Sequence, residues 1–207
     1  MILKSLIRNN KIGVVILAAG SSSRLGYPKQ LVEFEGKPML QHIIDVAGSF
    51  EFETEVLVLG AGAEEIKEKI EPGKFEILLN ENWQEGMASS IRTGLERSLE
   101  KEKDLEHLLI LLSDQPFVSE ERIEALIKEQ LDGNSEATFS EYDGDVGVPA
   151  IFSSSVFPYL KELKGDHGAK KLVYDKKIQF RTVKFEKGNF DVDTKDDVEL
   201  LKKLEKE

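Results

Sequence analysis

The sequence of 207 residues contains no cysteine, which excludes disulfide-stabilised folds, thiolate metal sites and cysteine nucleophiles. Its longest wholly apolar run covers only six residues, 14–19, whereas a membrane-spanning helix needs about 20. Basic residues are also fewer than acidic ones, with 28 Lys and Arg against 39 Asp and Glu. The resulting net charge of −11 argues against a dedicated nucleic-acid-binding protein. The first ten residues have too short an apolar stretch for a signal peptide and lack a small-residue cleavage site. We therefore expect a cytoplasmic protein that binds neither nucleic acid nor membrane.

Hydrophobic residues make up 40% of the chain, enough for the core of one domain. Four apolar runs have the pattern of strands buried on both faces: residues 12–19, 55–59, 75–79 and 108–112. Amphipathic stretches at 39–50, 64–70 and 86–99 alternate with them and predict helices. Ser119 and Thr194 are typical N-cap residues, and each is expected to begin a further helix. This alternation predicts a mostly parallel sheet covered by helices on both faces.

The second half of the chain has a different pattern. Strand candidates at 138–142, 147–152 and 178–185 are separated by turns and two helices, which predicts an antiparallel excursion in the sheet. The predicted fold is thus α/β, a single Rossmann-like three-layer domain over residues 1–207. Ligands of such sheets bind at the carboxyl ends of the strands, so the segments after the first, third and fourth predicted strands are the candidate site.

A loop rich in small residues, 20–31, follows the first predicted strand. Glycine and serine allow main-chain N–H groups to approach a phosphate, and Arg24 and Lys29 could add a bidentate donor and a point charge. The loop is not a Walker A motif, because Gly26 is followed by Tyr27, and it lacks the dinucleotide pattern GxGxxG. On composition alone, a flexible turn with two solvated cations remains an alternative.

The string LAAGSSSRLGYPKQL at 17–31 resembles the signature loop of the MobA-like nucleotidyltransferases, in particular the molybdenum cofactor cytidylyltransferases. Members of that family hold the triphosphate of the incoming nucleotide with this loop. The resemblance implies that the phosphates lie against Gly20, Ser21, Arg24, Gly26 and Lys29. It also implies that the base lies beside Leu17, Ala18 and Ala19.

Four further segments resemble motifs of the same family. Residues 80–92 are similar to a motif ending in G-M-S-S-S, which implies that Gly86, Ser89 and Ser90 border the nucleotide, although position 88 is alanine here. Residues 113–116 resemble its D-Q-P motif, 165–170 its G-D-x-G-A-[RK] stretch, and 191–194 its closing D-[IV]-D-T. The family often has G-H-P where this chain has Val148 between Gly147 and Pro149, so any polar contact of that histidine is absent.

Three aspartates are expected to serve a magnesium ion. The resemblance implies that Asp114 binds Mg²⁺, which would offset the repulsion between two joined anions. Magnesium usually takes only one or two protein carboxylates. Asp191 and Asp193 follow the last predicted strand, and we expect both near the site, one as a metal ligand and the other as a cap of the final helix. An isolated aspartate after a strand can also be a simple turn residue.

Other reactive side chains fit structural roles better. His42 is expected to be structural and His107 solvated, and three scattered histidines make a zinc site improbable. The serines lack a GxSxG context for a nucleophile. Trp83 could stack on a pterin-like ring, but a lone tryptophan more often anchors a loop.

The resemblance implies a magnesium-dependent enzyme with Arg24, Lys29 and Asp114 as catalytic residues. It would transfer CMP from CTP to the molybdopterin form of molybdenum cofactor, with a nucleotide-binding part at about 11–118, an acceptor-binding part at about 134–193 and a molybdoenzyme as a further partner. The segments 18–20 and 28–30 favour the cytidylyl branch over a guanylyltransferase using GTP. A sugar-phosphate nucleotidyltransferase and a non-catalytic carrier that delivers cofactor to a molybdenum hydroxylase remain alternatives.

Overall fold

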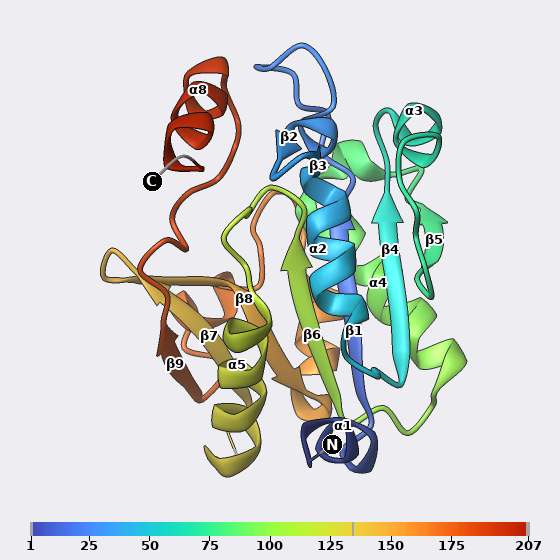
Figure 1. Cartoon of the computed structure of the whole chain (residues 1–207). Helices are drawn as coiled ribbons and strands as arrows, with labels where there is room; N and C mark the ends of the chain where they lie inside the picture. The colour runs from blue at the N-terminus through green and yellow to red at the C-terminus, as the bar shows by residue number, and fades with distance from the viewer. Residues whose placement is uncertain (1, 134, 206–207) are drawn as a thin grey trace.

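Seven strands form one sheet in the order β5-β4-β1-β6-β8-β7-β9 (Figure 1). The structure is a computed structural model that describes residues 2–133 and 135–205; residues 1, 134, 206 and 207 of the expected 1–207 domain lie outside them. The strands are β1 (Ile12–Ala18), β4 (Thr54–Leu59), β5 (Glu76–Leu79), β6 (His107–Leu112), β7 (Ala137–Tyr142), β8 (Asp145–Ser153) and β9 (Phe180–Lys184). A separate hairpin pairs β2 (Glu33–Phe34) with β3 (Lys37–Pro38).

The central strand β1 is buried along its whole length, because it lies between β4 and β6 and is covered on both faces. Its side chains alternate between two cores. Val14 and Ile16 pack with residues of α2 (Met39–Gly48) and α5 (Glu120–Gly133). Val15 and Leu17 pack with residues of α4 (Met87–Lys101) and α6 (Phe157–Glu162). A continuous apolar run is what such a doubly covered strand requires, and this part of the sequence prediction is confirmed.

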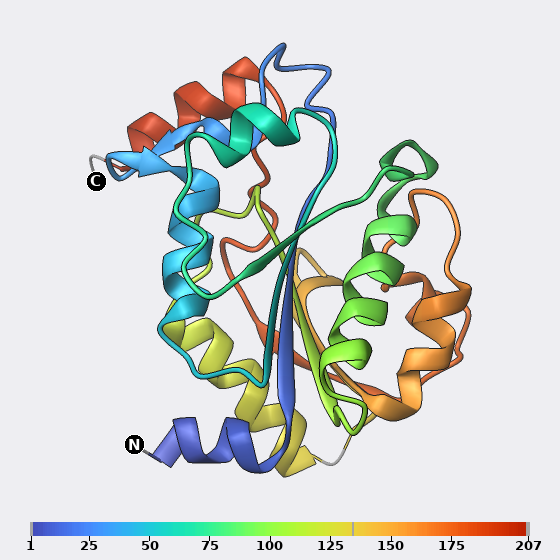
Figure 2. The same cartoon turned by 90° about the vertical axis from the view of Figure 1, so that its right-hand side faces the viewer.

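Helices form a layer on each face of the sheet (Figure 2). One layer contains α2 (Met39–Gly48) and α5 (Glu120–Gly133), with α1 (Ile2–Asn9) and α3 (Ala63–Lys67) at its margins. The other contains α4 (Met87–Lys101) and α6 (Phe157–Glu162), with α7 (Lys171–Tyr174) nearby. The predicted three-layer α/β fold is therefore confirmed.

In the described part of the chain, β8 is the one sheet strand that runs antiparallel to its neighbours, pairing with β6 and β7. The strands β7 and β9 are again parallel to each other. The predicted antiparallel excursion in the second half is thus confirmed and consists of this single strand.

The last helix, α8 (Lys195–Leu204), crosses the carboxyl end of the sheet and packs beside the β2–β3 hairpin (Figure 2). Leu201 and Val192 share a small core with Phe34 and Met39. Thr194 caps the helix as expected: its Oγ1 accepts from the Asp197 N–H at 3.3 Å, and the Asp197 carboxylate accepts from the Thr194 N–H at 2.7 Å. Ser119 Oγ similarly accepts from the N–H of Arg122, at 3.4 Å, at the start of α5.

Three elements were not predicted from the sequence. Strands β2 and β3 have two residues each, too short for any alternation to be recognised. Helix α1 lies in the first ten residues, which the sequence analysis considered only as a possible signal peptide. No helix in residues 2–133 or 135–205 is long and apolar enough to cross a membrane.

The topology positions the candidate site. From β1, the chain continues to β4 on one side, whereas β6 is added later on the other side. The carboxyl ends of β1 and β6 therefore lie together at the point where the strand order reverses, which is where ligands bind in open α/β sheets.

Candidate functional site

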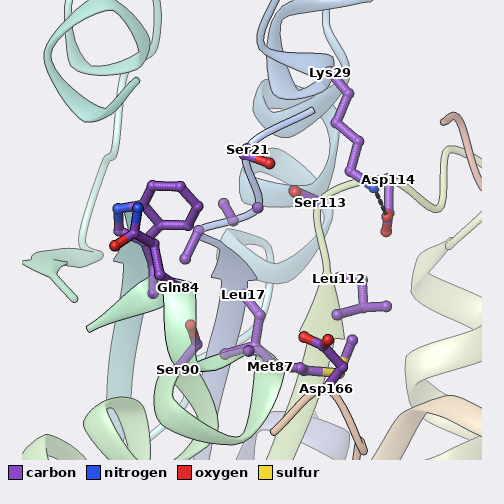
Figure 3. A pocket seen from close by; sticks show the side chains of 15 residues that line it. Leu17, Ser21, Lys29, Gln84, Met87, Ser90, Leu112, Ser113, Asp114 and Asp166 are labelled. Carbon is purple, nitrogen blue, oxygen red and sulfur yellow. Dashed lines mark hydrogen bonds and ion pairs between the residues drawn. The ribbon is translucent and has the colours of Figure 1, made fainter. Parts of the chain in front are cut away.

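A cavity of about 380 Å³ opens at the carboxyl ends of β1 and β6 (Figure 3). Nine of the predicted site residues line it, and they come from three separate segments of the chain. These residues are Leu17, Ala18, Ala19, Gly20, Ser21, Lys29, Gly86, Ser90 and Asp114. The parallel strands thus bring together the motifs that the sequence separates by up to about a hundred positions.

The loop after β1 is held by a buried glutamine that the sequence analysis did not single out. Gln30 is fully buried, and its Nε2 donates to the carbonyl oxygens of Ala18 at 2.8 Å and Gly20 at 3.3 Å. Ser22 has a φ of 51° and accepts a hydrogen bond at Oγ from the Lys29 N–H at 2.9 Å. These bonds fix the path of the loop and place Lys29 at the cavity.

The N–H groups of Gly20 and Ser21 donate to no acceptor in the described part of the chain. Both residues line the cavity, and no atom lies within 4 Å of the position of a Cβ on Gly20. Two unpaired main-chain donors beside a lysine ammonium can bind an anion.

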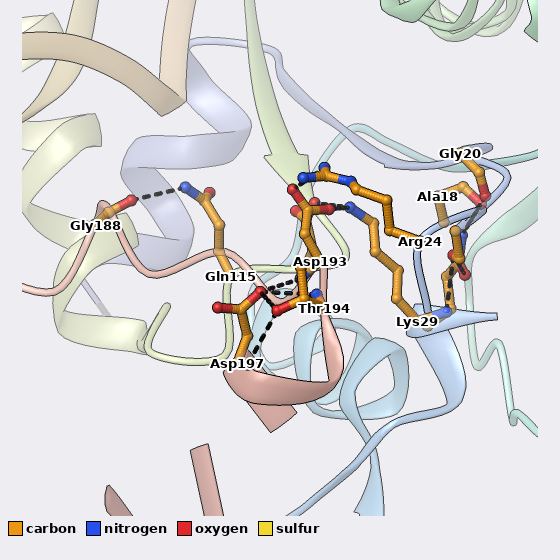
Figure 4. Close-up of polar contacts among 12 residues, drawn as sticks. Ala18, Gly20, Arg24, Lys29, Gln115, Gly188, Asp193, Thr194 and Asp197 are labelled. Atoms are coloured by element: carbon orange, nitrogen blue, oxygen red, sulfur yellow. Dashed lines mark hydrogen bonds and ion pairs between the residues drawn. The ribbon is translucent and has the colours of Figure 1, made fainter. Parts of the chain in front are cut away.

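Two cations and two carboxylates form a network beside the cavity (Figure 4). Lys29 Nζ lies 2.5 Å from Asp114 Oδ2 and 2.7 Å from Asp193 Oδ1, so one ammonium joins both carboxylates. Arg24 Nη2 contacts the second oxygen of Asp193 at 2.6 Å. The side chains of Lys29 and Asp114 are 15% and 13% exposed, whereas Arg24 is 67% exposed and remains largely in solvent.

The network shifts the pKa values of its members. Burial opposes the charge of Lys29, but the neighbouring charges and hydrogen bonds of Asp114 and Asp193 outweigh it and raise the lysine pKa. Burial likewise opposes the charge of Asp193, and its bonds to Lys29 and Arg24 outweigh that effect and lower its pKa. Lys29 and Asp193 are therefore both held in their charged forms.

Asp191 lies in a different environment. Part of its side chain reaches solvent, but the surrounding protein atoms desolvate the carboxyl group, and the charge of Asp114 repels it. Together these raise the pKa of Asp191 to about 7. The sequence could not rank these two aspartates as metal ligands. In the structure, Asp193 forms ion pairs with Lys29 and Arg24, whereas the charged form of Asp191 is disfavoured.

The segment 80–90 forms the opposite wall. Asn80 Nδ2 donates to Ser89 Oγ at 2.8 Å and to Ser90 Oγ at 2.9 Å. Ser89 Oγ in turn donates to the carbonyl oxygens of Gly86 and Asn82, at 2.8 and 3.0 Å. Ser89 therefore holds the wall together and does not line the cavity, whereas Ser90 lies at the surface of the cavity.

Gly86 adopts a φ of 99°, which favours glycine. A Cβ there would lie 2.4 Å from Asp166 Oδ1 and 2.5 Å from the Gly165 carbonyl carbon, so this glycine also permits the close approach of the segment 165–170.

Some predicted residues lie outside the main cavity. Gly26 lines an adjoining hollow on the far side of the loop, Asp191 lines a second cavity, and Arg24 and Asp193 are joined to the site through Lys29. Conversely, several residues of the cavity wall lie within the recognised motifs without having been assigned a nucleotide contact. They are Gln84, Met87, Ser113 and Asp166, with Leu112 from the end of β6 and Trp83 from the loop before α4.

The expectation for His107 is wrong. The side chain lies in β6, its Nδ1 is buried without a hydrogen-bond partner in the described residues, and burial lowers its pKa. The strand pairing of β6 with β1 and β8 leaves this position half-buried, which the sequence pattern did not reveal. His42 is structural as expected, with Nε2 3.2 Å from the Val118 carbonyl oxygen and an edge contact to Phe34.

The donor set fits one divalent cation. Asp114 Oδ1 is buried and has no hydrogen-bond partner in the described residues, and carboxylate oxygens are the ligands that magnesium and manganese prefer. Asp193 is within reach, since its carboxylate binds the same ammonium as Asp114. Across residues 2–133 and 135–205, no three acidic, histidine or cysteine side chains form a metal-binding cluster, so the three expected aspartates are not assembled as one.

Solved structures with the same fold cover nearly the whole chain. The structure of an Rv0371c homologue from Mycobacterium sp. strain JC1 superposes with a TM-score of 0.81 at 30% identity, covering 94% of this chain and 97% of the other. The manganese complex of Rv0371c from Mycobacterium tuberculosis H37Rv gives a TM-score of 0.75 at 30% identity, over 92% and 97% of the two chains.

Sequence relatives have varied names. The bifunctional protein GlmU of Thermosipho africanus is 33% identical over 162 residues, which cover 76% of this chain but only 34% of GlmU. The chain therefore spans about a third of that relative. The nicotine blue oxidoreductase of Paenarthrobacter nicotinovorans is 30% identical over 166 residues, 75% of this chain and 78% of the relative.

The sequence profile of the MobA-like NTP transferase domain matches residues 14–180. This range includes the loop after β1, the segment before α4, Asp114 and the segment 165–170. It leaves out residues 1–13, which contain α1 and the start of β1, and residues 181–207, which contain most of β9 and α8. The chain belongs to the MobA-like NTP transferase family.

Proposed function

We propose that this protein is a divalent-cation-dependent nucleotidyltransferase that transfers CMP from CTP to the molybdopterin form of molybdenum cofactor and releases pyrophosphate. The observation that carries the proposal is the junction of Arg24, Lys29, Asp114 and Asp193 beside a cavity lined by free main-chain donors. Membership in the MobA-like NTP transferase family supports the reaction class.

The triphosphate would bind where the cations are. Lys29 and Arg24 supply a point charge and a planar fork of donors, and the N–H groups of Gly20 and Ser21 are free to donate hydrogen bonds to phosphate oxygens. Phosphate binding would draw Lys29 away from its two carboxylates. Lys29 would thus bind the phosphate in the complex and the two aspartates in the free protein.

The released carboxylates would hold the divalent cation. Asp114, with its unpaired buried Oδ1, and Asp193 would provide one or two ligands, and phosphate oxygens and water would complete the shell. The cation would stabilise the charge that develops around the transferred phosphorus. The manganese complex of the related Rv0371c supports a divalent ion in this fold.

Charge balance favours the same arrangement. Three aspartates and two cations give the site a formal charge of about −1 when Asp191 is ionised, and a triphosphate adds roughly −4. Without an additional cation, the carboxylates would repel the nucleotide that Lys29 and Arg24 attract.

The chemistry needs no protein nucleophile. An oxygen of the acceptor phosphate forms a bond to the α-phosphorus, and the bond between that phosphorus and the bridging oxygen of the β-phosphate breaks. The electron pair leaves with pyrophosphate, and no proton needs to be removed because the attacking phosphate is already ionised at neutral pH. The residues of this chain would act by alignment and charge neutralisation.

Nucleotide choice is tested by pyrophosphate release with each of the four nucleoside triphosphates in the presence of the acceptor and Mg²⁺. We expect turnover with CTP. Turnover with GTP alone would indicate a guanylyltransferase, and turnover with a sugar phosphate as acceptor would indicate a different substrate class.

The matched variants are Asp114→Asn and Asp132→Asn. Asp132 is an exposed aspartate at the end of α5. Loss of the Asp114 carboxylate should lower kcat by about a hundredfold or more, because a charge-stabilising group is removed, whereas Asp132→Asn should be neutral. If the wild-type protein binds molybdopterin but releases no pyrophosphate, the non-catalytic carrier is favoured instead.

A further inference from the structure

A second cavity of about 200 Å³ adjoins the first one on the side of β8 and the segment 165–170. Its floor is apolar and comes from β6 and α4, with Ile91 and Ile110 among its residues. Its polar groups are the Tyr142 hydroxyl, the carboxylates of Asp166 and Asp191, and the Lys170 ammonium. An apolar floor with a few convergent polar groups is typical of a pocket for a ring-shaped ligand.

The two cavities share one boundary. Leu17, Met87, Leu112 and Asp166 line both of them, and Asp166 is the only charged residue among these four. Figure 3 shows its carboxylate beside Met87 and Leu17 at the wall of the cavity. A ligand that extends from the first cavity into the second passes beside this residue.

Asp166 is an exposed residue, and its backbone segment is tied to the start of α4. The Gly165 carbonyl oxygen accepts from the Ala88 N–H at 3.1 Å, which ties this segment to the start of α4, and the lack of a side chain at Gly86 leaves room for Asp166 Oδ1. In the described part of the chain, the Asp166 carboxylate has no hydrogen bond or ion pair. Both oxygens are therefore available to a ligand.

The charges of the second cavity indicate what it can take. Two carboxylates face a single lysine, and Lys170 is already bound to Asp145 at 3.2 Å. A phosphate is therefore better placed near Lys29 and Arg24 than here. A carboxylate accepts two parallel hydrogen bonds most favourably from adjacent N–H donors in one plane, as at the edge of a 2-amino-4-oxo heterocycle.

We propose that Asp166 binds the paired N–H edge of the acceptor's pterin ring, with the ring on the apolar floor of the second cavity and the acceptor phosphate toward Lys29. This inference rests on the proposed function, because it assigns a binding residue for the acceptor of that same reaction. The carboxylate thereby selects acceptors that carry adjacent N–H donors over those that present only hydroxyl groups or carbonyl oxygens.

The test uses two independent spectroscopic probes on the full chain. Binding of 6-hydroxymethylpterin is followed by the fluorescence anisotropy of the pterin, and binding of CTP with Mg²⁺ is followed by the emission of Trp83, the single tryptophan, which lines the first cavity. We expect Asp166→Asn to weaken pterin binding about ten- to hundredfold, the effect of losing a charged hydrogen-bond partner. The Kd for CTP should stay within about twofold of the wild-type value, since the triphosphate donors are untouched.

Asp175→Asn is the matched control, because Asp175 is an exposed aspartate of the same region that lines neither cavity. Lumazine, in which oxygen replaces the 2-amino group, is the ligand control: wild type should prefer the pterin, and Asp166→Asn should lose that preference. A purely structural role for Asp166 would leave the preference intact, which would overturn the inference.

Other outcomes are equally decisive. If Asp166→Asn weakens GTP binding and leaves pterin binding unchanged, the carboxylate recognises a guanine base and the inference is wrong. If wild type binds CTP and releases pyrophosphate but does not bind the pterin, the inference fails while the proposed reaction class stands. Failure of wild type to bind any nucleotide would instead overturn the proposed function itself.

Discussion

At the scale of single residues, Lys29 has the largest influence on the site. Its ammonium lies between Asp114 and Asp193 and neutralises two carboxylates that would otherwise repel each other. Because Lys29 and Asp114 are 15% and 13% exposed, this pair is protected from solvent and interacts more strongly than a surface pair.

Lys29→Met is expected to have two effects. Removing one partner of a buried pair should lower the free energy of unfolding by about 3 kcal/mol. The same change should strengthen Mn²⁺ binding in the absence of nucleotide, because no ammonium competes for the carboxylates. Chemical denaturation and Mn²⁺ titration by electron paramagnetic resonance measure the two quantities.

Lys37→Met is the control for this prediction. Lys37 also forms an ion pair, with Asp45 at 2.5 Å, but both side chains are about 40% exposed or more. Its loss should cost less than about 1 kcal/mol and leave Mn²⁺ binding unchanged. Equal Mn²⁺ affinities for wild type and Lys29→Met would show that the lysine does not compete with the cation.

Asp191 gives a pH-dependent prediction. Its pKa is raised from the ordinary value of 3.8 to about 7 by desolvation and by Asp114, so the folded state binds more protons than the unfolded state between these values. Stability is therefore lost as the pH rises from about 4 to about 7, and the loss levels off above that. Asp191→Asn should raise Tm, and the gain should grow from about pH 5 to about pH 8.

Thermal unfolding at the two pH values measures this effect, and a gain that does not change with pH would contradict it. Asp193→Asn provides the contrast. The bonds of Asp193 to Lys29 and Arg24 outweigh its burial and lower its pKa, so its carboxylate stabilises the fold at neutral pH and its loss should lower Tm.

The sequence predicted which residue types gather at the site but not how each one is used. The motifs that contain Lys29, Asp114 and Ser90 were recognised by their resemblance to motifs of the MobA-like family, and each of them follows a predicted strand. The burial of Gln30 and the structural bonding of Ser89 could not be predicted, since both depend on which distant carbonyl oxygens the fold places beside them.

At the scale of secondary-structure elements, the loop before α8 carries two of the three site aspartates, and the start of that helix fixes the loop. The Asp197 carboxylate accepts from the N–H groups of Thr194 at 2.7 Å and Asp193 at 3.1 Å. It therefore orders both the helix end and the residue that bonds Lys29.

Asp197→Ala should lower the free energy of unfolding by about 1–2 kcal/mol, since a capping carboxylate and its hydrogen bonds are lost. It should also weaken Mn²⁺ binding, because Asp193 becomes less ordered. Asp196→Ala is the control: this exposed residue lies in the same helical turn, and its loss should cost only about 0.5 kcal/mol through the helix dipole. Equal effects of the two substitutions on stability and Mn²⁺ binding would contradict this role of the cap.

Element prediction from the sequence worked where burial imposes a pattern. The fully buried strands β1 and β4 appear in the sequence as apolar runs, and the N-cap residue Thr194 predicts the start of α8. The hairpin β2–β3 was missed because it is stabilised by long-range packing against α8 and not by any local pattern of its own.

At the scale of the whole molecule, the expected nucleotide-binding and acceptor-binding parts share one sheet. β6, from the first part, pairs with β8, from the second, and Ile151 and Phe185 of the second part pack in the same core as Val14 and Leu109. Neither part can bury its apolar surface without the other.

We therefore expect a single cooperative unfolding transition with equal calorimetric and van't Hoff enthalpies. A chain ended at about residue 118 should not fold, because β6 would lose the neighbour on one side and both cores would be open. Two resolved transitions in a calorimetric scan would instead show that the parts are independent.

One main-chain contact limits how far this site can vary. The Val192 N–H donates to the Asp114 carbonyl oxygen at 3.2 Å, so the backbone itself joins the two segments that carry the site aspartates. The link involves no side-chain atom, so substitutions elsewhere that leave the backbone path unchanged keep it. Directed evolution toward new acceptors could thus randomise Tyr142, Val148 and Lys170 together. The distance between the Asp114 and Asp193 segments would stay the same in all members of the library.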